Sequence, residues 1–202
     1  MKKYSIIYSD PPWAYNDKAQ AGRRGAEFQY PTMTIKNIKL LNMKPHLAND
    51  CVLFMWVTAP MMPQQLQVLK AWGFTYKTIA FTWVKRAKNG GYRWGMGNWT
   101  RANPEYCILG VRGNPKRVDK GVHSVIDEIP GRHSEKPDEV RKRIVKLMGD
   151  LPRLEMFART APSGWDAWGN QVESDVVIEP MKAKKYLKGL REKMKARKED
   201  NV

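Results

Sequence analysis

Cysteine and histidine are scarce in this sequence, which has two of the first and three of the second among its 202 residues. Cys51 and Cys107 each begin an apolar stretch, so we expect both to be buried thiols in a reducing cytoplasm rather than partners in a disulfide. The histidines have no metal-ligand spacing with one another or with the cysteines. The sequence therefore predicts a cytoplasmic protein and predicts no metal site.

Long apolar runs are also lacking. None is long enough to span a bilayer, and Lys2-Lys3 leads into a run that is too short for a signal peptide, so we expect no membrane partner. A chain of 202 residues can bury a core as a single domain without disulfides. We place that domain at residues 1–179 and expect a basic C-terminal tail at residues 180–202.

Acidic residues are few compared with basic ones. The chain has 20 Asp and Glu against 36 Lys and Arg, which gives a formal net charge of +16. Residues 182–198 hold nine of the basic residues and one acid, yet the rest of the chain still has a net charge of +8. Because a field of that sign attracts polyanions, the composition favours a nucleic-acid partner.

Segments with strand periodicity alternate with segments of helical periodicity along the chain. Such alternation is typical of an α/β protein with a mostly parallel sheet and helices on both faces. One predicted helix is opened by Pro60 and Pro63 and ends at Gly73. The other predicted helices are residues 35–43 and 139–148, and the predicted strands are residues 4–9, 51–57, 75–85, 107–112, 154–158 and 175–178.

The tetrad Asp10-Pro11-Pro12-Trp13 directly follows the first predicted strand. An exocyclic amine of a nucleobase is a poor nucleophile because its lone pair is delocalised into the ring. A carboxylate on Asp10 and the Pro11 carbonyl, presented by a stiff Pro-Pro unit, could accept its two N–H bonds. Trp13 could stack on the extruded base. The tetrad therefore predicts a catalytic site that alkylates a nucleobase amine through positioning and electrostatics.

A structural alternative exists for the same four residues. Pro-Pro after a strand often only stops it, with the aspartate in a turn and the tryptophan as a core anchor. The position of Asp10 at the carboxyl end of a buried strand favours the functional interpretation, because open α/β sheets bind their ligands there.

Two polar segments are candidates for substrate binding. The loop at residues 14–30 has the size of a lid over an extruded base, although it could also be an ordinary surface loop. Residues 85–101 interleave cations with aromatic residues, which suits phosphate contact and base stacking. The residues that we expect to contact the substrate are Tyr15, Arg23, Arg24, Lys85, Arg93 and Arg101.

Three motifs in order resemble one enzyme family. They are Asp10 to Trp13, the run His133-Ser134-Glu135-Lys136-Pro137-Asp138-Glu139, and the pair Leu154 to Arg159 and Gly164 to Gln171. Together they resemble the mRNA adenosine N6-methyltransferase catalytic-subunit family, the MT-A-seventy family, with its phage and bacterial DNA relatives. The resemblance spans roughly residues 4 to 172. It implies a Rossmann-like, S-adenosylmethionine-dependent methyltransferase fold with the catalytic motif before the cofactor-binding half.

The resemblance also implies roles for particular residues. Lys136 matches a lysine that lies near the cofactor carboxylate in relatives, and Arg159, Asn170 and Gln171 match positions that contact the cofactor ribose and adenine. These residue types suit such contacts, although a solvated lysine at a helix start and amides closing a turn are the structural alternatives. We include Asp10 in both the catalytic and the cofactor-binding sets. Glu105 is similar to a family position but has no assigned role.

One departure concerns the cofactor adenine. Some relatives contact it from a segment upstream of the tetrad, and only nine residues precede Asp10 here. The set of cofactor contacts is therefore incomplete.

The expected function is S-adenosylmethionine-dependent N6-adenine methylation of nucleic acid, with bacterial or phage DNA favoured over RNA. The alternatives are an RNA adenosine or cytosine N4 methyltransferase and a non-catalytic nucleic-acid-binding subunit of the same fold. The sequence leaves open whether the protein forms a homodimer or requires a partner subunit.

Overall fold

A computed structural model describes residues 1–14, 31–95, 99–131 and 135–181. Within these ranges the chain forms a seven-stranded sheet in the order β5-β3-β4-β2-β1-β6-β7. The strands are β1 (Tyr4–Ser9), β2 (Leu47–Val57), β3 (Thr75–Lys85), β4 (Glu105–Arg112), β5 (Val125–Glu128), β6 (Arg153–Met156) and β7 (Asp166–Trp168). Among these seven strands only β4 runs antiparallel to its neighbours, so the sheet is mostly parallel.

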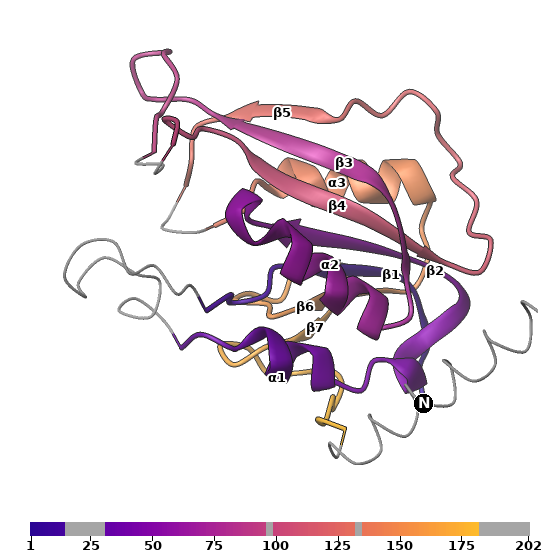
Figure 1. Cartoon of the computed structure of the whole chain (residues 1–202). Helices are drawn as coiled ribbons and strands as arrows, with labels where there is room; N and C mark the ends of the chain where they lie inside the picture. The colour runs from indigo at the N-terminus through magenta and orange to yellow at the C-terminus, as the bar shows by residue number, and fades with distance from the viewer. Residues whose placement is uncertain (15–30, 96–98, 132–134, 182–202) are drawn as a thin grey trace, which may run out of the picture.

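Helices cover both faces of this sheet (Figure 1). They are α1 (Ile35–Leu40), α2 (Met62–Ala71) and α3 (Asp138–Met148), with short 3-10 turns η2 (Lys44–His46) and η3 (Ala59–Met61). Alternate residues of β2 pack on opposite sides. Leu53 joins the core that contains α1 and α2, whereas Phe54 joins the core that contains α3. β2 is therefore buried on both faces, which explains its continuous apolar run.

Local sequence signals account for the helix boundaries. The Thr34 hydroxyl accepts a hydrogen bond from the Asn37 N–H and caps α1. Gly73 follows α2 with a φ of +94°, which a glycine adopts without strain. The predicted helix at 35–43 ends earlier than expected because Leu41 is already extended, with ψ at 125°.

One predicted strand does not form, and the two short strands β5 and β7 were not predicted. No strand forms at residues 175–178; instead, Val176 and Ile178 pack their side chains onto the core beside α1, and the last strand is β7. The short strand β5 was not predicted, because three of its four residues are exposed or half-buried and Ile126 alone is fully buried. Two adjacent charges and one buried apolar side chain make too short a pattern to indicate a strand.

No helix in the described ranges is long and apolar enough to cross a membrane. Cys51 and Cys107 are buried free thiols, in agreement with the expectation from the sequence.

Candidate active site

The sheet brings one end of each of its seven strands to a single edge. β1, β2, β3, β5, β6 and β7 end there, and β4 begins there because it is antiparallel. A cavity of about 560 Å³ opens at this edge, within the range of ligand pockets in enzymes. The predicted site residues that line it are Asp10, Pro11, Pro12, Trp13, Lys85, Lys136, Arg159, Asn170 and Gln171.

The tetrad forms a tight turn immediately after β1. The Trp13 N–H donates to the Pro11 carbonyl over 2.8 Å, closing a three-residue turn around Pro12, whose ring fixes φ near the value that such a turn needs. The Pro12 carbonyl accepts from the Met33 N–H, also over 2.8 Å. These two bonds fix the direction of the Pro11 carbonyl, which keeps a second lone pair for another donor.

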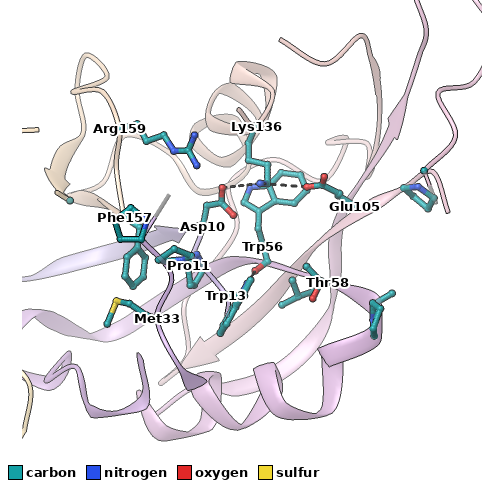
Figure 2. A pocket seen from close by; sticks show the side chains of 18 of the residues that line it. Asp10, Pro11, Trp13, Met33, Trp56, Thr58, Glu105, Lys136, Phe157 and Arg159 are labelled. Carbon is teal, nitrogen blue, oxygen red and sulfur yellow. Dashed lines mark hydrogen bonds and ion pairs between the residues drawn. The ribbon is translucent and has the colours of Figure 1, made fainter. Parts of the chain in front are cut away.

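Four charged side chains form a chain across the cavity. The Lys136 ammonium lies 2.8 Å from the Asp10 carboxylate and 3.4 Å from the Glu105 carboxylate, as Figure 2 shows. Lys85 pairs with the other oxygen of Glu105. Lys136 is therefore not a solvated lysine, since only 11% of its side chain is exposed. The alternating signs compensate one another where little water is present.

The surroundings shift the pKa values of these groups. Burial raises the pKa of Asp10 despite the opposing effect of Lys136, and the negative charge of Glu105 adds to the rise. Burial also acts to raise the pKa of Glu105, but Lys136 and Lys85 outweigh it and hold that pKa below its usual value. Burial acts to lower the pKa of Lys136, and the two carboxylates outweigh it and raise that pKa. Lys136 is therefore charged at any physiological pH.

Two tryptophans, Trp56 and Trp13, lie in the cavity wall beside these charged side chains. The Trp56 ring lies 5.5 Å from the Lys136 ammonium, and its indole N–H donates to the buried Tyr8 hydroxyl over 2.7 Å. The Trp13 indole N–H donates to the Trp56 carbonyl over 3.1 Å. Trp13 is only 4% exposed and belongs to the core. Its expected role as an open stacking surface is thus not supported, because packing covers most of the ring; the core-anchor alternative fits Trp13.

The opposite wall comes from the segments after β6 and β7. Phe157 has a φ of +60°, a strained value for a residue other than glycine, and its ring packs edge-on against Trp168 at 5.2 Å. Arg159 follows from the same segment and reaches the cavity (Figure 2). Gly169 passes so close to Ala158 that an added Cβ would lie 2.1 Å from the Ala158 oxygen. This close approach brings Asn170 and Gln171 to the cavity.

The remaining predicted contacts lie elsewhere. Arg93 and Arg101 are exposed and do not line the cavity, although their neighbours Gly95 and Ala102 do. Tyr15, Arg23 and Arg24 lie outside the described residues, as do His133 and Ser134 of the second motif.

Sequence reasoning assigned no role to many residues that line the cavity. Among them, Trp56 and Phe157 have the pattern of ordinary strand or strand-end residues in the sequence, and Glu105 was noted only as similar to a family position. The signal available for Glu105 was an acid directly after Pro104 at the start of an apolar strand.

A Rossmann-like sheet with a carboxylate-Pro-Pro turn beside a cavity at its carboxyl edge defines a class, the methyltransferases that act on amino groups of nucleobases. A family model described as MT-A70 matches residues 4–171. The chain therefore belongs to the MT-A70 family, and the predictions of this family, of its fold and of an N6-adenine methyltransferase are confirmed at the level of the family.

Individual relatives differ in how much of their length the chain spans. It is 34% identical over 197 residues to the type II methyltransferase M.MunI of a Mycoplasma species, covering 89% of this chain and 82% of that protein. It is 29% identical over 184 residues to the human N(6)-adenosine-methyltransferase catalytic subunit METTL3, covering 88% of this chain but only 30% of METTL3. An Arabidopsis thaliana N(6)-adenosine-methyltransferase MT-A70-like protein is 31% identical, with 26% of its length covered.

Proposed function

We propose that the protein transfers a methyl group from S-adenosylmethionine to N6 of adenine in DNA. The observation that carries the proposal is the Asp10 carboxylate beside the fixed Pro11 carbonyl at the edge of the 560 Å³ cavity. Asp10 faces this cavity rather than the protein interior (Figure 2). DNA is favoured because the chain spans most of a bacterial type II methyltransferase and less than a third of METTL3.

The two acceptors position the target amine. Asp10 accepts one N–H bond of the amino group, and the second lone pair of the Pro11 carbonyl accepts the other. Two acceptors at fixed positions turn the nitrogen lone pair away from the ring and toward the methyl donor. The methylated nitrogen is acidic and loses its proton readily, so Asp10 need not be a strong base. A base in a duplex must leave the stack to reach this cavity, which makes base flipping part of the proposal.

The cavity wall fits S-adenosylmethionine. When bound, the cofactor supplies an electrophilic methyl group on a sulfonium ion. Lys136 provides the cation for its carboxylate, and Arg159, Asn170 and Gln171 provide donors and acceptors for the ribose hydroxyls and adenine. Phe157 adds an apolar surface to the same wall. The buried thiols Cys51 and Cys107 support our placing of the protein in the reducing cytoplasm.

The test replaces the acceptor and analyses the product. Asp10→Ala and the equally shaped Asp10→Asn should each lower kcat by about 10²-fold or more, a loss typical of removing one positioned polar group. The fold and much of the nucleic-acid binding should persist. Mass spectrometry of digested product should find N6-methyladenine with wild type and with the control Glu173→Gln, an exposed acid outside the cavity. Retained activity of Asp10→Ala would contradict the mechanism.

RNA is the second candidate substrate, because several relatives are named N(6)-adenosine-methyltransferases. Parallel assays on single-stranded DNA, duplex DNA and RNA separate the candidates, and the same digests distinguish N6-methyladenine from N4-methylcytosine. Calorimetric titration with S-adenosylmethionine tests the alternative of a non-catalytic subunit, which would not need to bind the cofactor.

A further inference from the structure

The described residues of the connection between β3 and β4 form a structured arm rather than an open loop. We define the β3–β4 arm as residues 86–95 and 99–104. Its first part is a short hairpin in which Arg86 bridges Tyr92, with a turn closed by the Ala87 N–H to the Gly91 carbonyl over 2.8 Å. Farther along, the Arg93 N–H donates to the Lys85 carbonyl over 2.9 Å. These backbone bonds give the arm a defined shape.

Asn103 ties the arm to the cavity wall. Its side-chain amide donates to the carbonyls of Lys85 and Arg93, both over 2.8 Å, and its oxygen accepts from the Lys85 N–H. The residue is 8% exposed and lines the cavity. One buried, hydrogen-bonded side chain thus fixes the outer arm relative to the active site.

The arm carries the exposed tryptophans of the protein. The chain has eight tryptophans, all within the described residues, and six of them are buried or half-buried. Trp94 and Trp99 are 62% and 99% exposed. The Trp94 ring lies 5.7 Å from Tyr92, and Tyr92 lies against the Arg86 guanidinium at 4.2 Å. Large aromatic rings that are exposed to solvent on an arm of defined conformation indicate a binding surface.

The charged residues within the arm have one sign. Residues 85–104 contain five cations and no acid. Arg86 pairs with Asp127 over 2.6 and 2.7 Å, and Lys88, Arg93 and Arg101 are exposed residues of the arm. Cations interleaved with aromatic rings are the surface that binds unpaired nucleic acid. Two copies of this surface meeting across a two-fold axis would place like charges together.

The arm also lies next to the cavity in which the target adenine would bind. Gly95 and Ala102 line the cavity and are joined by a backbone hydrogen bond of 2.6 Å. Figure 1 shows the arm leaving β3 on the side of the molecule where β1 ends. A strand whose adenine enters the cavity therefore has its neighbouring nucleotides close to the arm.

We propose that the β3–β4 arm binds the nucleotides that flank the target adenine as unpaired bases. Trp94 and Trp99 each stack on one flanking base, and Arg93 and Arg101 contact the adjoining phosphates. The inference rests on the proposed function, because it needs a nucleic-acid substrate. It adds the class of substrate that the enzyme holds, namely a strand that is locally single.

The experiment is a double-mutant cycle for binding, in which one change is made in the protein and the other in the oligonucleotide. A labelled single strand of about 12 nucleotides with one adenine, within the site sizes of single-strand binders, is compared with the same strand lacking the bases on both sides of that adenine. Fluorescence anisotropy gives Kd for wild type, Trp94→Ala, Trp99→Ala and the corresponding Phe variants. Each Ala variant should weaken binding of the intact strand about tenfold, as the loss of one stacked base does. The Phe variants should restore most of the affinity.

The second half of the cycle identifies stacking. The strand without flanking bases should bind wild type more weakly, and the Ala substitutions should then have little further effect, because the stacking partner is already absent. Tyr76→Ala is the control. Tyr76 is 43% exposed near the amino end of β3, about 30 Å from Lys85 at the usual rise per residue, and its removal should change neither Kd.

Three outcomes would overturn the inference. These are unchanged binding by the Ala variants, equal losses on both strands, and a wild-type dimer in sedimentation that Trp99→Ala dissociates, which would make the arm a protein interface. Failure of the proposed function is a separate result, because it would appear as absent adenine methylation by wild type while this binding cycle still shows coupling.

Discussion

At the scale of single residues, the protonation of Asp10 depends on the ion pairs that Lys136 forms with two carboxylates. The ammonium lies 2.8 Å from Asp10 and 3.4 Å from Glu105. Burial raises the pKa of Asp10 most, Lys136 lowers it and Glu105 raises it. Since the proposed mechanism needs an ionised Asp10, activity should fall on the acid side as this carboxylate becomes protonated, at a pH above the usual range for aspartate.

Two substitutions should move this acid limb in opposite directions. Lys136→Met removes the positive neighbour, so the pKa of Asp10 should rise and the acid limb of kcat/KM should shift to higher pH. Glu105→Gln removes the negative neighbour, so the limb should shift to lower pH. The measurement is kcat/KM against pH for wild type and both variants at saturating cofactor. Shifts of the same sign in both variants would show that Asp10 does not titrate in this profile.

At the scale of elements, the site is built by the segments that follow the strands. The expected strand at residues 75–85 forms with the bounds that the pattern predicts, and β1 likewise matches residues 4–9. The alternation of apolar and polar residues, with proline or glycine at the boundaries, is enough to predict such elements. The short elements at the sheet edges are different, because β5 and β7 owe their pairing to neighbours that local sequence does not reveal.

The segment after β7 depends on the close approach of Gly169 to Ala158. Gly169→Ala would place a Cβ 2.1 Å from the Ala158 oxygen, so the segment bearing Asn170 and Gln171 must move. We expect S-adenosylmethionine to bind at least about tenfold more weakly and the free energy of unfolding to fall by about 1–3 kcal/mol. Calorimetry and urea unfolding measure the two effects.

The control for this substitution is Gly121→Ala. Gly121 is exposed, and the nearest atom to its added Cβ is a side-chain oxygen of Asp119 at 3.3 Å. It should leave cofactor binding unchanged. Wild-type affinity in Gly169→Ala would mean that Asn170 and Gln171 do not hold the cofactor.

At the scale of the whole molecule, net charge governs the encounter with nucleic acid. The chain has a formal net charge of +16, and residues 182–198, which lie outside the described residues, hold nine cations and one acid. The field of the globular part is therefore positive even without this tail.

Deleting residues 182–202 separates the contribution of the tail from that of the globular part. If the tail binds phosphates, the slope of log K against log salt for single-stranded DNA should become shallower by about 0.7 for each phosphate that the tail neutralises in the full chain. Binding measured between about 50 and 200 mM salt gives this slope for the full and the shortened chain. An unchanged slope would leave the tail without a role in phosphate binding.

The sequence alone indicated the alternation of strands and helices, the tetrad Asp10 to Trp13 and the family, because periodicity, proline positions and motif spacing are local properties of the chain. It missed β5 and β7 and predicted a strand at residues 175–178 that does not form. It also indicated Lys136, Arg159, Asn170 and Gln171, through the resemblance. Only the tertiary structure decided that Trp13 anchors the core, that Glu105 joins the charged chain and that Phe157 adopts a positive φ. Those properties depend on which side chains meet across strands far apart in sequence, where packing and desolvation outweigh local preference.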